Sequence, residues 1–433
     1  MKNYKFLVPI ILVVIFIGSI YMLYDTKATQ MQAYKAALIE ARGFREKDIQ
    51  VDAEDYYMQA LELNPSLDLY VEIGEFYLET EQSKKAIEWG ETTTAIYPEN
   101  VKGYEFLMGI YHQKEDYIEC FDIADVVEKR KLKSVFIDEI IEQIQFTFYF
   151  NGEYDEVGIF SGGLCPVRNG QKWGYVNQSG VRAIDLQFSY AGPFAQGLAP
   201  VTDGEGNSYY IDTAGNKKHV VLGVEKIEKL GLIERELFSM YNGSEWMFYN
   251  TNHELVFGSF EDASAIGNGV AAVKSNGKWS LVDRSGTKLV EGSFANVVMD
   301  EKGVVYRNER LFVSGGEGYQ MINSAGEKIG SENYDEARIF NDATYAAVKM
   351  DGKWGFVDKD GEKVINPQYE DARSFANGFA AVKKNGLWGF INTEGKIVIE
   401  FQFDGARDFN SNGCVFVLTD SEWELLRLYK SNH

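Results

Sequence analysis

The sequence predicts a multi-domain protein that is α-helical at first and all-β afterwards, with a single transmembrane helix, helical hairpins and an array of about eight β repeats. Three observations support this prediction. Residues 6–24 form an apolar run without a charge, residues 25–150 show helical spacing, and a pattern of about 35 residues recurs within residues 151–433. A fixed period of this size is typical of repeat architectures.

The apolar run at residues 6–24 is long enough to cross a hydrocarbon core of roughly 30 Å. Lys2 and Lys5 precede it, so the positive-inside rule predicts a cytoplasmic tip and signal anchor at residues 1–24, with the rest of the chain outside the cytoplasm. A cleaved signal peptide is the alternative. The run exceeds the usual length of about 7 to 15 residues and no A-x-A-like site follows, which favours an uncleaved anchor.

The composition limits the classes of partner. The chain has 65 acidic and 43 basic residues and a net charge of -22, which argues against nucleic acid, because phosphates require clustered Lys and Arg. The three cysteines, Cys120, Cys165 and Cys414, are an odd number without a pairing pattern, so we expect no disulfide framework. We expect each to be a small buried residue.

Residues 25–150 contain a weak helical repeat of about 34 residues. One copy has Tyr70, Ile73, Gly74, Tyr77, Ala86 and Pro98; the next has Tyr104, Leu107, Met108, Tyr111 and Cys120; an earlier copy is indicated by Ala53, Ala60 and Pro65. This spacing resembles the tetratricopeptide repeat, and the alternative is a plain antiparallel bundle. Such units usually bind a peptide on a concave face. The candidate peptide-binding residues are Tyr70, Tyr77, Tyr104 and Tyr111, with packing as the alternative role.

The β unit is defined by its turns. Asn385-Gly386 predicts a type I′ hairpin, because both central residues need positive φ, and Asp351-Gly352 and Asn276-Gly277 repeat it. After each following strand, an Asn or Asp stands three residues before a Gly, which is typical of a type I turn. The pairs are Asn177 and Gly180, Asp212 and Gly215, Asp283 and Gly286, Asn323 and Gly326, Asp358 and Gly361, and Asn392 and Gly395. This chemistry also explains Asp358 to Glu362, which only faintly resembles a calcium loop.

A Trp begins the strand after most of the hairpins, and three of these six Trp residues are followed by Gly. The repeat-defining residues are Trp173, Gly174, Trp246, Trp279, Trp354, Gly355, Trp388, Gly389 and Trp423, while Ser208 and Tyr319 stand where Trp would be expected. Recurrence at one place in every unit favours packing between units over a ligand platform. The Gly indicates a close approach of another backbone.

A spacer joins the hairpins: an aromatic residue, two residues, Ala or Val, two residues and then usually Phe, as in Tyr154-Val157-Phe160 and Phe403-Ala406-Phe409. Its spacing of three would suit a helical turn or a tight bend. Together with the Trp-Gly strands, it resembles the WG β-repeat family of bacterial proteins over residues 154–423. The resemblance implies a β-rich, extracytoplasmic or surface module without assigned chemistry.

The two ends of the array complement each other. The array begins with a spacer at Tyr154 to Phe160 and ends with a hairpin at Gly413 to Tyr429. Such ends favour a propeller-like ring, which removes exposed strand edges, over an open β-solenoid. Against the ring, 35 residues should provide only two or three strands, whereas a propeller blade usually has four.

The sequence has few residues in patterns that could serve catalysis, so we expect that the protein is not an enzyme. The histidines, at positions 112, 219, 253 and 433, have no metal spacing, no nucleophile or phosphate motif occurs, and we expect neither cofactor nor metal. The sequence therefore predicts a membrane-anchored, non-catalytic interaction scaffold at the bacterial cell envelope, whose partner is another protein or a peptide. The alternative is a protein that binds or processes envelope glycan, because abundant acids leave a carboxylate pair open.

Overall fold

The computed structural model describes residues 4–218, 227–342 and 344–429, without the side chains of residues 4–15 and 17–25. Two compact units divide the chain, Met1–Gln145 and Phe146–His433. The expected boundary between residues 150 and 151 falls inside the first strand of the second unit, β1(Phe148–Tyr154).

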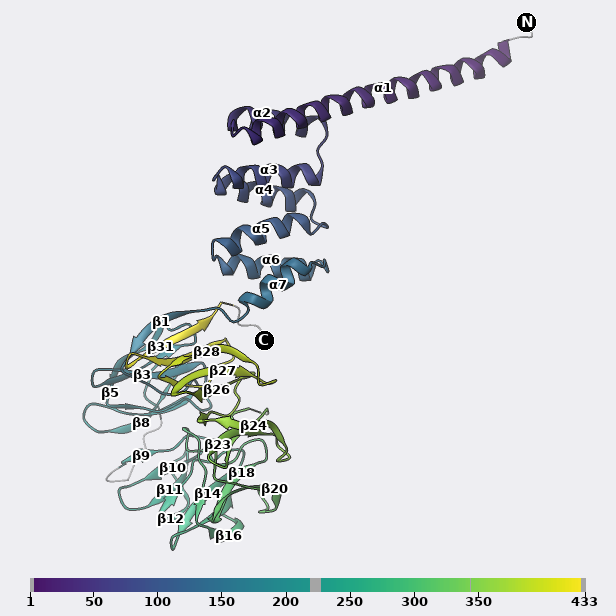
Figure 1. Cartoon of the computed structure of the whole chain (residues 1–433). Helices are drawn as coiled ribbons and strands as arrows, with labels where there is room; N and C mark the ends of the chain where they lie inside the picture. The colour runs from purple at the N-terminus through teal and green to yellow at the C-terminus, as the bar shows by residue number, and fades with distance from the viewer. Residues whose placement is uncertain (1–3, 219–226, 343, 430–433) are drawn as a thin grey trace. The chain divides into compact units, whose positions relative to one another are not determined.

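The first unit is helical (Figure 1). Among its described residues the helices are α1(Tyr4–Glu46), α2(Gln50–Leu63), α3(Leu67–Glu79), α4(Ser83–Ile96), α5(Lys102–Gln113), α6(Tyr117–Lys129) and α7(Val135–Ile144). Consecutive helices pack as hairpins, α1 with α2, α3 with α4 and α5 with α6. Small residues allow this packing: a Cβ added at Gly74 would lie 2.7 Å from the Phe106 ring, and Ala86 is fully buried.

The predicted membrane anchor lies outside the described side chains. The backbone of residues 6–24 belongs to α1, but of the side chains in this range only that of Phe16 is described. Within the part of the chain that is described, we find no helix with the length and apolar character of a membrane span. The anchor therefore stays a prediction.

The strands of the second unit form eight sheets in the described residues, seven of four strands and one of three. We call them blades 1 to 8. They are blade 1, β2(Glu156–Val157), β3(Leu164–Asn169), β4(Lys172–Asn177) and β5(Arg182–Phe188); blade 2, β6(Tyr190–Ala191), β7(Leu198–Thr202) and β8(Ser208–Asp212); blade 3, β9(Lys229–Leu230), β10(Leu237–Tyr241), β11(Trp246–Asn250) and β12(Leu255–Phe260); blade 4, β13(Asp262–Ala263), β14(Val270–Ser275), β15(Lys278–Asp283) and β16(Lys288–Phe294); blade 5, β17(Asn296–Val297), β18(Leu311–Gly316), β19(Gly318–Ile322) and β20(Lys328–Tyr334); blade 6, β21(Glu336–Ala337), β22(Ala346–Met350), β23(Lys353–Val357) and β24(Lys363–Tyr369); blade 7, β25(Asp371–Ala372), β26(Phe379–Lys384), β27(Leu387–Asn392) and β28(Ile397–Phe403); blade 8, β29(Gly405–Ala406), β30(Cys414–Thr419), β31(Glu422–Leu428) and β1.

The ring is closed by strands from its two ends. β1, which precedes blade 1 in sequence, pairs antiparallel with β31 as the outer strand of blade 8 (Figure 1). Phe148 faces Leu428 and Tyr154 faces Trp423 in this register. The second unit is therefore an eight-bladed β-propeller over its described residues, which confirms the predicted ring.

The core of the propeller is divided among the interfaces between neighbouring blades. Each interface has its own apolar cluster, as between blades 6 and 7, where Phe356 and Tyr369 pack against Phe375. The interface at the closing seam is built in the same way, with Val157 and Cys165 of blade 1 against Phe416 of blade 8. Closure thus buries apolar surface as well as pairing strands.

The turns confirm the predicted chemistry. Asn385 and Gly386 have φ values of 53° and 83°, as a type I′ turn requires. The Asp358 carboxylate accepts the N–H groups of Asp360 and Glu362 at 2.9 Å, and Gly361 has a φ of 83°. The cysteines are free and buried, as expected.

The expected count of two or three strands per repeat is wrong. The spacer bends as expected, at Glu370 in blade 7, but its Ala or Val then ends a two-residue inner strand, such as β25. One repeat therefore supplies four strands, as in β25, β26, β27 and β28. A two-residue strand leaves too short a stretch for the period-two pattern that identifies strands in a sequence.

The Gly after the Trp lies where the outer strand comes close, as predicted. A Cβ at Gly174 or Gly389 would lie 2.6 or 2.7 Å from a carbonyl oxygen of the adjacent strand. Where another residue replaces this Gly, the outer strand carries one instead: Gly258 opposes Met247, and Gly292 lies beside Ser280. The degenerate repeats thus keep the close approach, but their Gly lies on the outer strand instead of after the Trp.

We expect Gly355→Ala to lower the free energy of unfolding of the propeller by about 1–3 kcal/mol, the usual cost of overpacking. A Cβ there would lie 2.6 Å from the Ile365 carbonyl oxygen and 2.7 Å from the Pro367 nitrogen. Urea unfolding followed by Trp fluorescence measures the change. Gly204→Ala is the control, because no heavy atom lies within 4 Å of its Cβ position. Equal free energies for the two variants would contradict the steric account.

Candidate functional site

Every blade places one residue at an equivalent point beside the axis of the ring, directly after its inner strand. Its backbone N–H donates to a carbonyl of the second strand, as from Arg373 to Ala381 at 2.8 Å. We call this point the ring position. In chain order it is occupied by Gly158, Gly192, Gly231, Ser264, Val298, Arg338, Arg373 and Arg407. Three consecutive blades therefore carry arginine at the ring position, and the others carry small or apolar residues.

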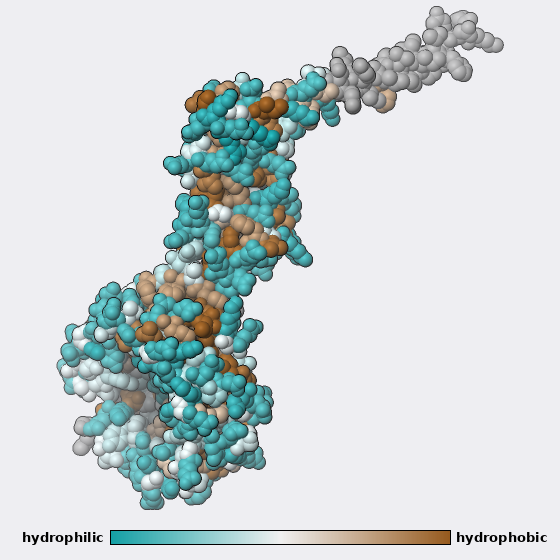
Figure 2. All heavy atoms as spheres, viewed as in Figure 1, coloured by the Kyte–Doolittle hydropathy of each residue, from teal (hydrophilic) through white to brown (hydrophobic). Residues whose placement is uncertain are grey.

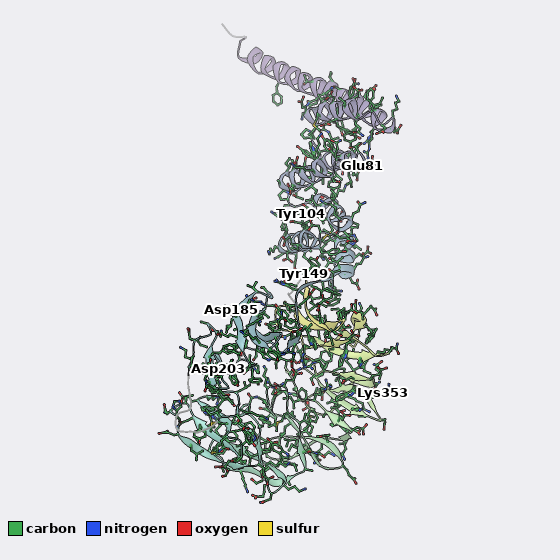
Figure 3. The ribbon with its side chains drawn as sticks, turned by 90° about the vertical axis from the view of Figure 1, so that its left-hand side faces the viewer. Glu81, Tyr104, Tyr149, Asp185, Asp203 and Lys353 are labelled. Atoms are coloured by element: carbon green, nitrogen blue, oxygen red, sulfur yellow. The ribbon has the colours of Figure 1, made fainter. Side chains whose placement is uncertain are left out.

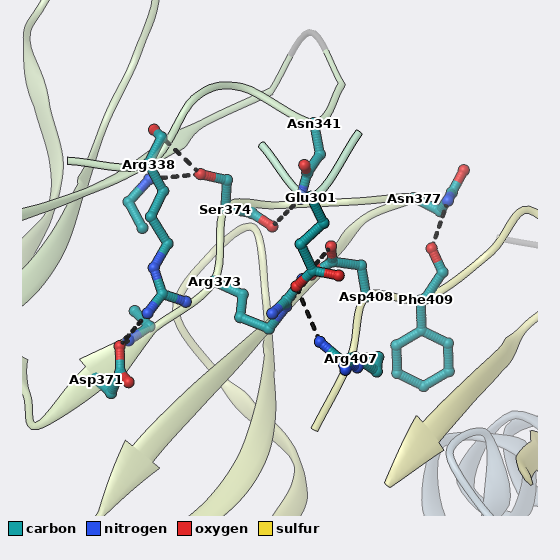
Figure 4. A network of polar contacts seen from close by, with 12 residues as sticks. Glu301, Arg338, Asn341, Asp371, Arg373, Ser374, Asn377, Arg407, Asp408 and Phe409 are labelled. Carbon is teal, nitrogen blue, oxygen red and sulfur yellow. Dashed lines mark hydrogen bonds and ion pairs between the residues drawn. The ribbon is translucent and has the colours of Figure 1, made fainter. Parts of the chain in front are cut away.

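Each ring-position arginine contacts the next blade (Figure 4). The contacts join Arg338 to Asp371, Arg373 to Asp408, and Arg407 to the carbonyl oxygen of Val157. The Arg373 guanidinium is bidentate, with Nε and Nη2 at 2.6 and 2.9 Å from the two carboxylate oxygens of Asp408. Because Val157 belongs to blade 1, the Arg407 contact crosses the closing seam.

A long loop of blade 5 also lies beside the ring-position arginines. Residues 298–310, which we call the blade 5 loop, join β17 to β18, whereas residues 373–378 are enough in blade 7. Ala265 donates its N–H to the Gly303 carbonyl at 2.8 Å, and Val304 is buried against Leu232. The loop is thus held by blades 3 and 4 on one side.

Glu301 connects the blade 5 loop to two of the ring-position arginines. Its Oε1 accepts from Nη2 of Arg373 and from Nη1 of Arg407, each at 2.9 Å (Figure 4). The neighbouring Asp300 carboxylate caps its own turn, and its Oδ2 accepts from Arg307 at 2.8 Å. The loop therefore has an internal ion pair and, separately, one carboxylate shared by two blades.

Burial and these ion pairs set the pKa values of the cations. Burial would lower the pKa of Arg373, but the Asp408 and Glu301 carboxylates outweigh it, and the pKa is raised. Burial lowers the pKa of Arg338 despite Asp371. Burial and the Arg307 charge lower the pKa of Lys302, against the opposing effect of Asp300 and Asp408.

A cavity of about 590 Å³ opens beside this network. Its lining comes from the loops that follow the inner strands of blades 1, 5, 6, 7 and 8, and includes Glu301, Lys302, Arg373, Asp408 and Asn410. We call it the arginine pocket. Its volume falls in the range of small-molecule and short-peptide sites, and its chemistry is that of paired charges with hydrogen-bond donors.

A second cavity of about 510 Å³ involves the other half of the ring, where the ring positions are small. Trp246 lines it half-buried, beside Tyr190, whose surface is 50% exposed. Ser239 also lines it, and its fully buried Oγ has no hydrogen-bond partner among the described atoms. This aromatic and hydroxyl lining suits a ring with hydroxyl groups, such as a sugar.

The helical unit has a groove of its own, of about 700 Å³, lined by residues of α1, α3, α5 and α7. Val71, Phe106 and Phe136 give it apolar surface, and Phe136 is 43% exposed. Apolar side chains appear between hydrophilic ones on the visible face of this unit (Figure 2). Arg45 and Lys102 share the groove with acidic residues.

The tyrosines expected to bind peptide do not line this groove. Tyr77 and Tyr104 are 2% and 6% exposed, and Tyr104 lies within the helical stack (Figure 3). Tyr70 and Tyr77 pack against Trp89 of α4. Tyr111 is half-buried outside the groove lining. Peptide binding by these four residues stays a prediction, and the groove offers different residues for it.

The repeat-defining tryptophans lie at equivalent places, each opposite the last aromatic residue of the outer strand. Trp354 pairs with Tyr369 and Trp388 with Phe403. Trp279 and Trp354 are 6% and 4% exposed, whereas Trp173, Trp246, Trp388 and Trp423 are half-buried. Two ring-position arginines stack on this set, Arg338 on Trp354 and Arg407 on Trp423, each 4.9 Å from the ring centroid.

The possible metal-ligating side chains lie apart from one another in the described residues. Groups of three or more His, Cys, Asp or Glu with metal-binding geometry are absent from them. His112 lies in α5 and His253 in the turn before β12, and the positions of His219 and His433 fall outside the described residues.

The sequence analysis did not identify the ring-position arginines or the blade 5 loop, although both are recognisable in the sequence. Arg338, Arg373 and Arg407 each follow the Ala of a spacer directly, and 13 residues separate Val297 from Leu311 where Ala372 and Phe379 are separated by six. An alignment of the repeats by their inner strands would have shown both.

The family model for the WG containing repeat matches residues 150–173, 173–205, 246–279, 322–354, 354–388 and 388–423. The C-terminal region is thus built of WG repeats, and the unmatched parts include the expected degenerate copies at Ser208 and Tyr319. The matches all lie after residue 149, so the resemblance of the helical unit to tetratricopeptide repeats stays a prediction. Curated proteins gave no match.

Several solved structures are similar at low identity. BamB from Moraxella catarrhalis matches with a TM-score of 0.43 and 13% identity over 65% of this chain and 100% of that chain. A eukaryotic initiation factor matches with a TM-score of 0.42 and 12% identity over 66% and 88%. Hsv2 from Kluyveromyces lactis matches with a TM-score of 0.37 and 10% identity over 57% and 94%. Similarity at this level carries no information about ligands or partners.

We expect Trp354→Ala to lower the free energy of unfolding of the propeller by about 3–5 kcal/mol, as for other buried Trp residues. The substitution leaves a cavity in the cluster with Phe356 and Phe375 and uncovers the Arg338 guanidinium. Trp388→Ala should cost less, because Trp388 is half-buried. Thermal unfolding of both variants gives the comparison. An unchanged midpoint for Trp354→Ala would rule out its packing role.

Proposed function

We propose that this protein is a membrane-anchored, non-catalytic scaffold of the bacterial cell envelope that binds a partner protein through its propeller and its helical unit. The observation that carries the proposal is the arginine pocket, where loops of five blades converge on one cavity of about 590 Å³. Propellers present such loops on a rigid ring, which lets residues far apart in sequence act together. The groove of the helical unit is a second candidate surface.

The state of the carboxylates in the arginine pocket supports binding over catalysis. Asp300, Glu301 and Asp408 each form an ion pair with an arginine. A glycosidase needs two carboxyl groups that flank the scissile bond, one of them protonated. Charges that are already paired in this way suit recognition of a polar surface.

Glycan binding is the second candidate, and the cavity around Trp246 and Tyr190 favours it. Aromatic faces stack on sugar rings, and the nearby hydroxyl and carboxylate groups offer hydrogen bonds. This cavity lies mainly in blades 2, 3 and 4. A glycan partner would therefore depend on Trp246 and Tyr190, which do not line the arginine pocket, although Glu301 and Lys302 line both cavities.

A capture experiment with the full chain in detergent tests the proposal. Ser411, which is exposed and lines the arginine pocket, is changed to Trp to block the pocket without removing an ion pair. We expect Ser411→Trp to reduce the recovery of a cross-linked envelope protein severalfold, with or without muramidase. Thr393→Trp, in an exposed turn of blade 7, is the control and should retain the partner.

Two outcomes would contradict the protein-scaffold proposal. If muramidase abolishes recovery for the wild type, the partner is glycan and the second candidate function replaces the first. If Ser411→Trp and Thr393→Trp recover the same amount of protein, the arginine pocket is not the binding surface.

A further inference from the structure

We infer that the arginine pocket is a receptor site for an acidic peptide segment, and that Glu301 of the blade 5 loop occupies this site as an internal substitute for the partner's carboxylate. The inference rests on the proposed binding function and assigns it a ligand chemistry. It also gives the blade 5 loop a role, since the Glu301 side chain must move aside for the partner to bind.

Glu301 has the contacts of a bound ligand more than those of a structural residue. Only Oε1 contacts the arginines, while Oε2 has no hydrogen bond among the described residues. The Glu301 side chain is 37% exposed, against 18% for Asp408 and 11% for Asp300. The Arg373 and Arg407 side chains in these ion pairs are only 14% and 24% exposed, so the departure of Glu301 has a cost, which an incoming carboxylate at the same arginines offsets.

The blade 5 loop does not depend on Glu301 for its conformation. Asp300 accepts the N–H groups of Lys302 and Val304 at 2.8 Å, and Arg307 holds the same carboxylate. Ala265 bonds to Gly303 on the other side. The Glu301 side chain can therefore leave the arginines while the backbone of the loop stays in place.

The departure of Glu301 leaves cationic charge without a counterpart. Arg373 keeps its bidentate bond to Asp408. Arg407 loses its one carboxylate partner among the described residues, and its Nε is already buried without a hydrogen bond. Lys302, half-buried in the same pocket, forms no ion pair with a described residue. An incoming carboxylate would restore the balance of charge at Arg407 and Lys302.

An unpaired amide indicates what else the ligand carries. Asn410 lines the arginine pocket and is 7% exposed. Its Oδ1 accepts the N–H groups of Asn412 and Cys414, which fixes the orientation of the amide, and its Nδ2 has no partner in the described part of the chain. Asn341 stands three residues after Arg338, as Asn410 does after Arg407, and it donates its Nδ2 to the Ser374 carbonyl of the next blade at 3.1 Å. The Asn410 amide therefore lacks a carbonyl acceptor, which a peptide backbone supplies.

The groups left short of partners are thus donors: the Arg407 guanidinium that Glu301 contacts and, in the lining of the pocket, the Lys302 ammonium and the Asn410 amide. A Glu or Asp side chain with an adjacent peptide carbonyl satisfies all three, because carboxylates accept charge-assisted bonds and carbonyls accept from amides. A phosphate group would meet the cations alone. The internal occupant is a carboxylate, and this favours an acidic peptide.

Binding of fluorescent hexaglutamate to the full chain in detergent tests the inference. If Glu301 fills the site for about nine-tenths of the time, Glu301→Gln should bind the peptide about tenfold more tightly than wild type. Glu317→Gln removes the same charge from an exposed hairpin of blade 5 and should leave the affinity unchanged.

Adding Arg407→Gln or Lys302→Met to Glu301→Gln should abolish the gain in affinity for hexaglutamate. Lys302→Met breaks no ion pair between described residues, so it tests the site even where Arg407→Gln fails to fold.

The inference is overturned if Glu301→Gln binds no better than Glu317→Gln, or if hexaglutamine binds as tightly as hexaglutamate. Competition by inorganic phosphate below the concentration at which hexaglutamate competes would identify a phosphate site instead. If hexaglutamate fails to bind but Ser411→Trp still loses its envelope partner, the scaffold proposal stands and only the acidic-peptide ligand is wrong.

Discussion

The pairing of β1 with β31 is the constraint on which the propeller depends. It joins the first strand of the second unit to the last and gives blade 8 its outer strand. The same seam holds an apolar cluster of Val157, Cys165 and Phe416, and the Arg407 contact to Val157. With the seam open, β1 and β31 would both expose unpaired backbone groups, which proteins avoid at sheet edges.

Closure also explains where function can reside. Each blade is packed on both faces by its neighbours, so the surface available for binding lies on the loops at the ends of the strands and around the axis of the ring. The ring position repeats the same backbone hydrogen bond in all the described blades, which fixes the starting point of each side chain. Arg373 of blade 7 and Arg407 of blade 8 can therefore both bond to Glu301 of blade 5 at 2.9 Å, although Glu301 lies far from both arginines in the sequence.

Local chemistry made most of the fold predictable. The backbone requirements of Asn385-Gly386, of Asp358 with Gly361 and of the Gly after Trp173, Trp354 and Trp388 can be recognised in the sequence itself, and the number of repeats follows from their period. The four-stranded blade was hidden because its inner strand has two residues, as in Asp371–Ala372. The arginine pocket was less predictable, because ion pairs such as Arg373 with Asp408 join different repeats. The surroundings of Tyr77 were also hidden, because helical spacing places a residue on a face of its helix but does not show that Trp89 covers that face.

The most direct test of the closed ring is hydrogen exchange on a chain that lacks residues 422–433, and therefore lacks β31. The account predicts that amides of β1 and of β3 in blade 1 lose protection together with those of β30, because the seam that joins them is gone. The wild-type chain under the same conditions gives the reference. Unchanged protection in β3, with the loss confined to β30 and its neighbours in sequence, would contradict the closed ring and establish an open array.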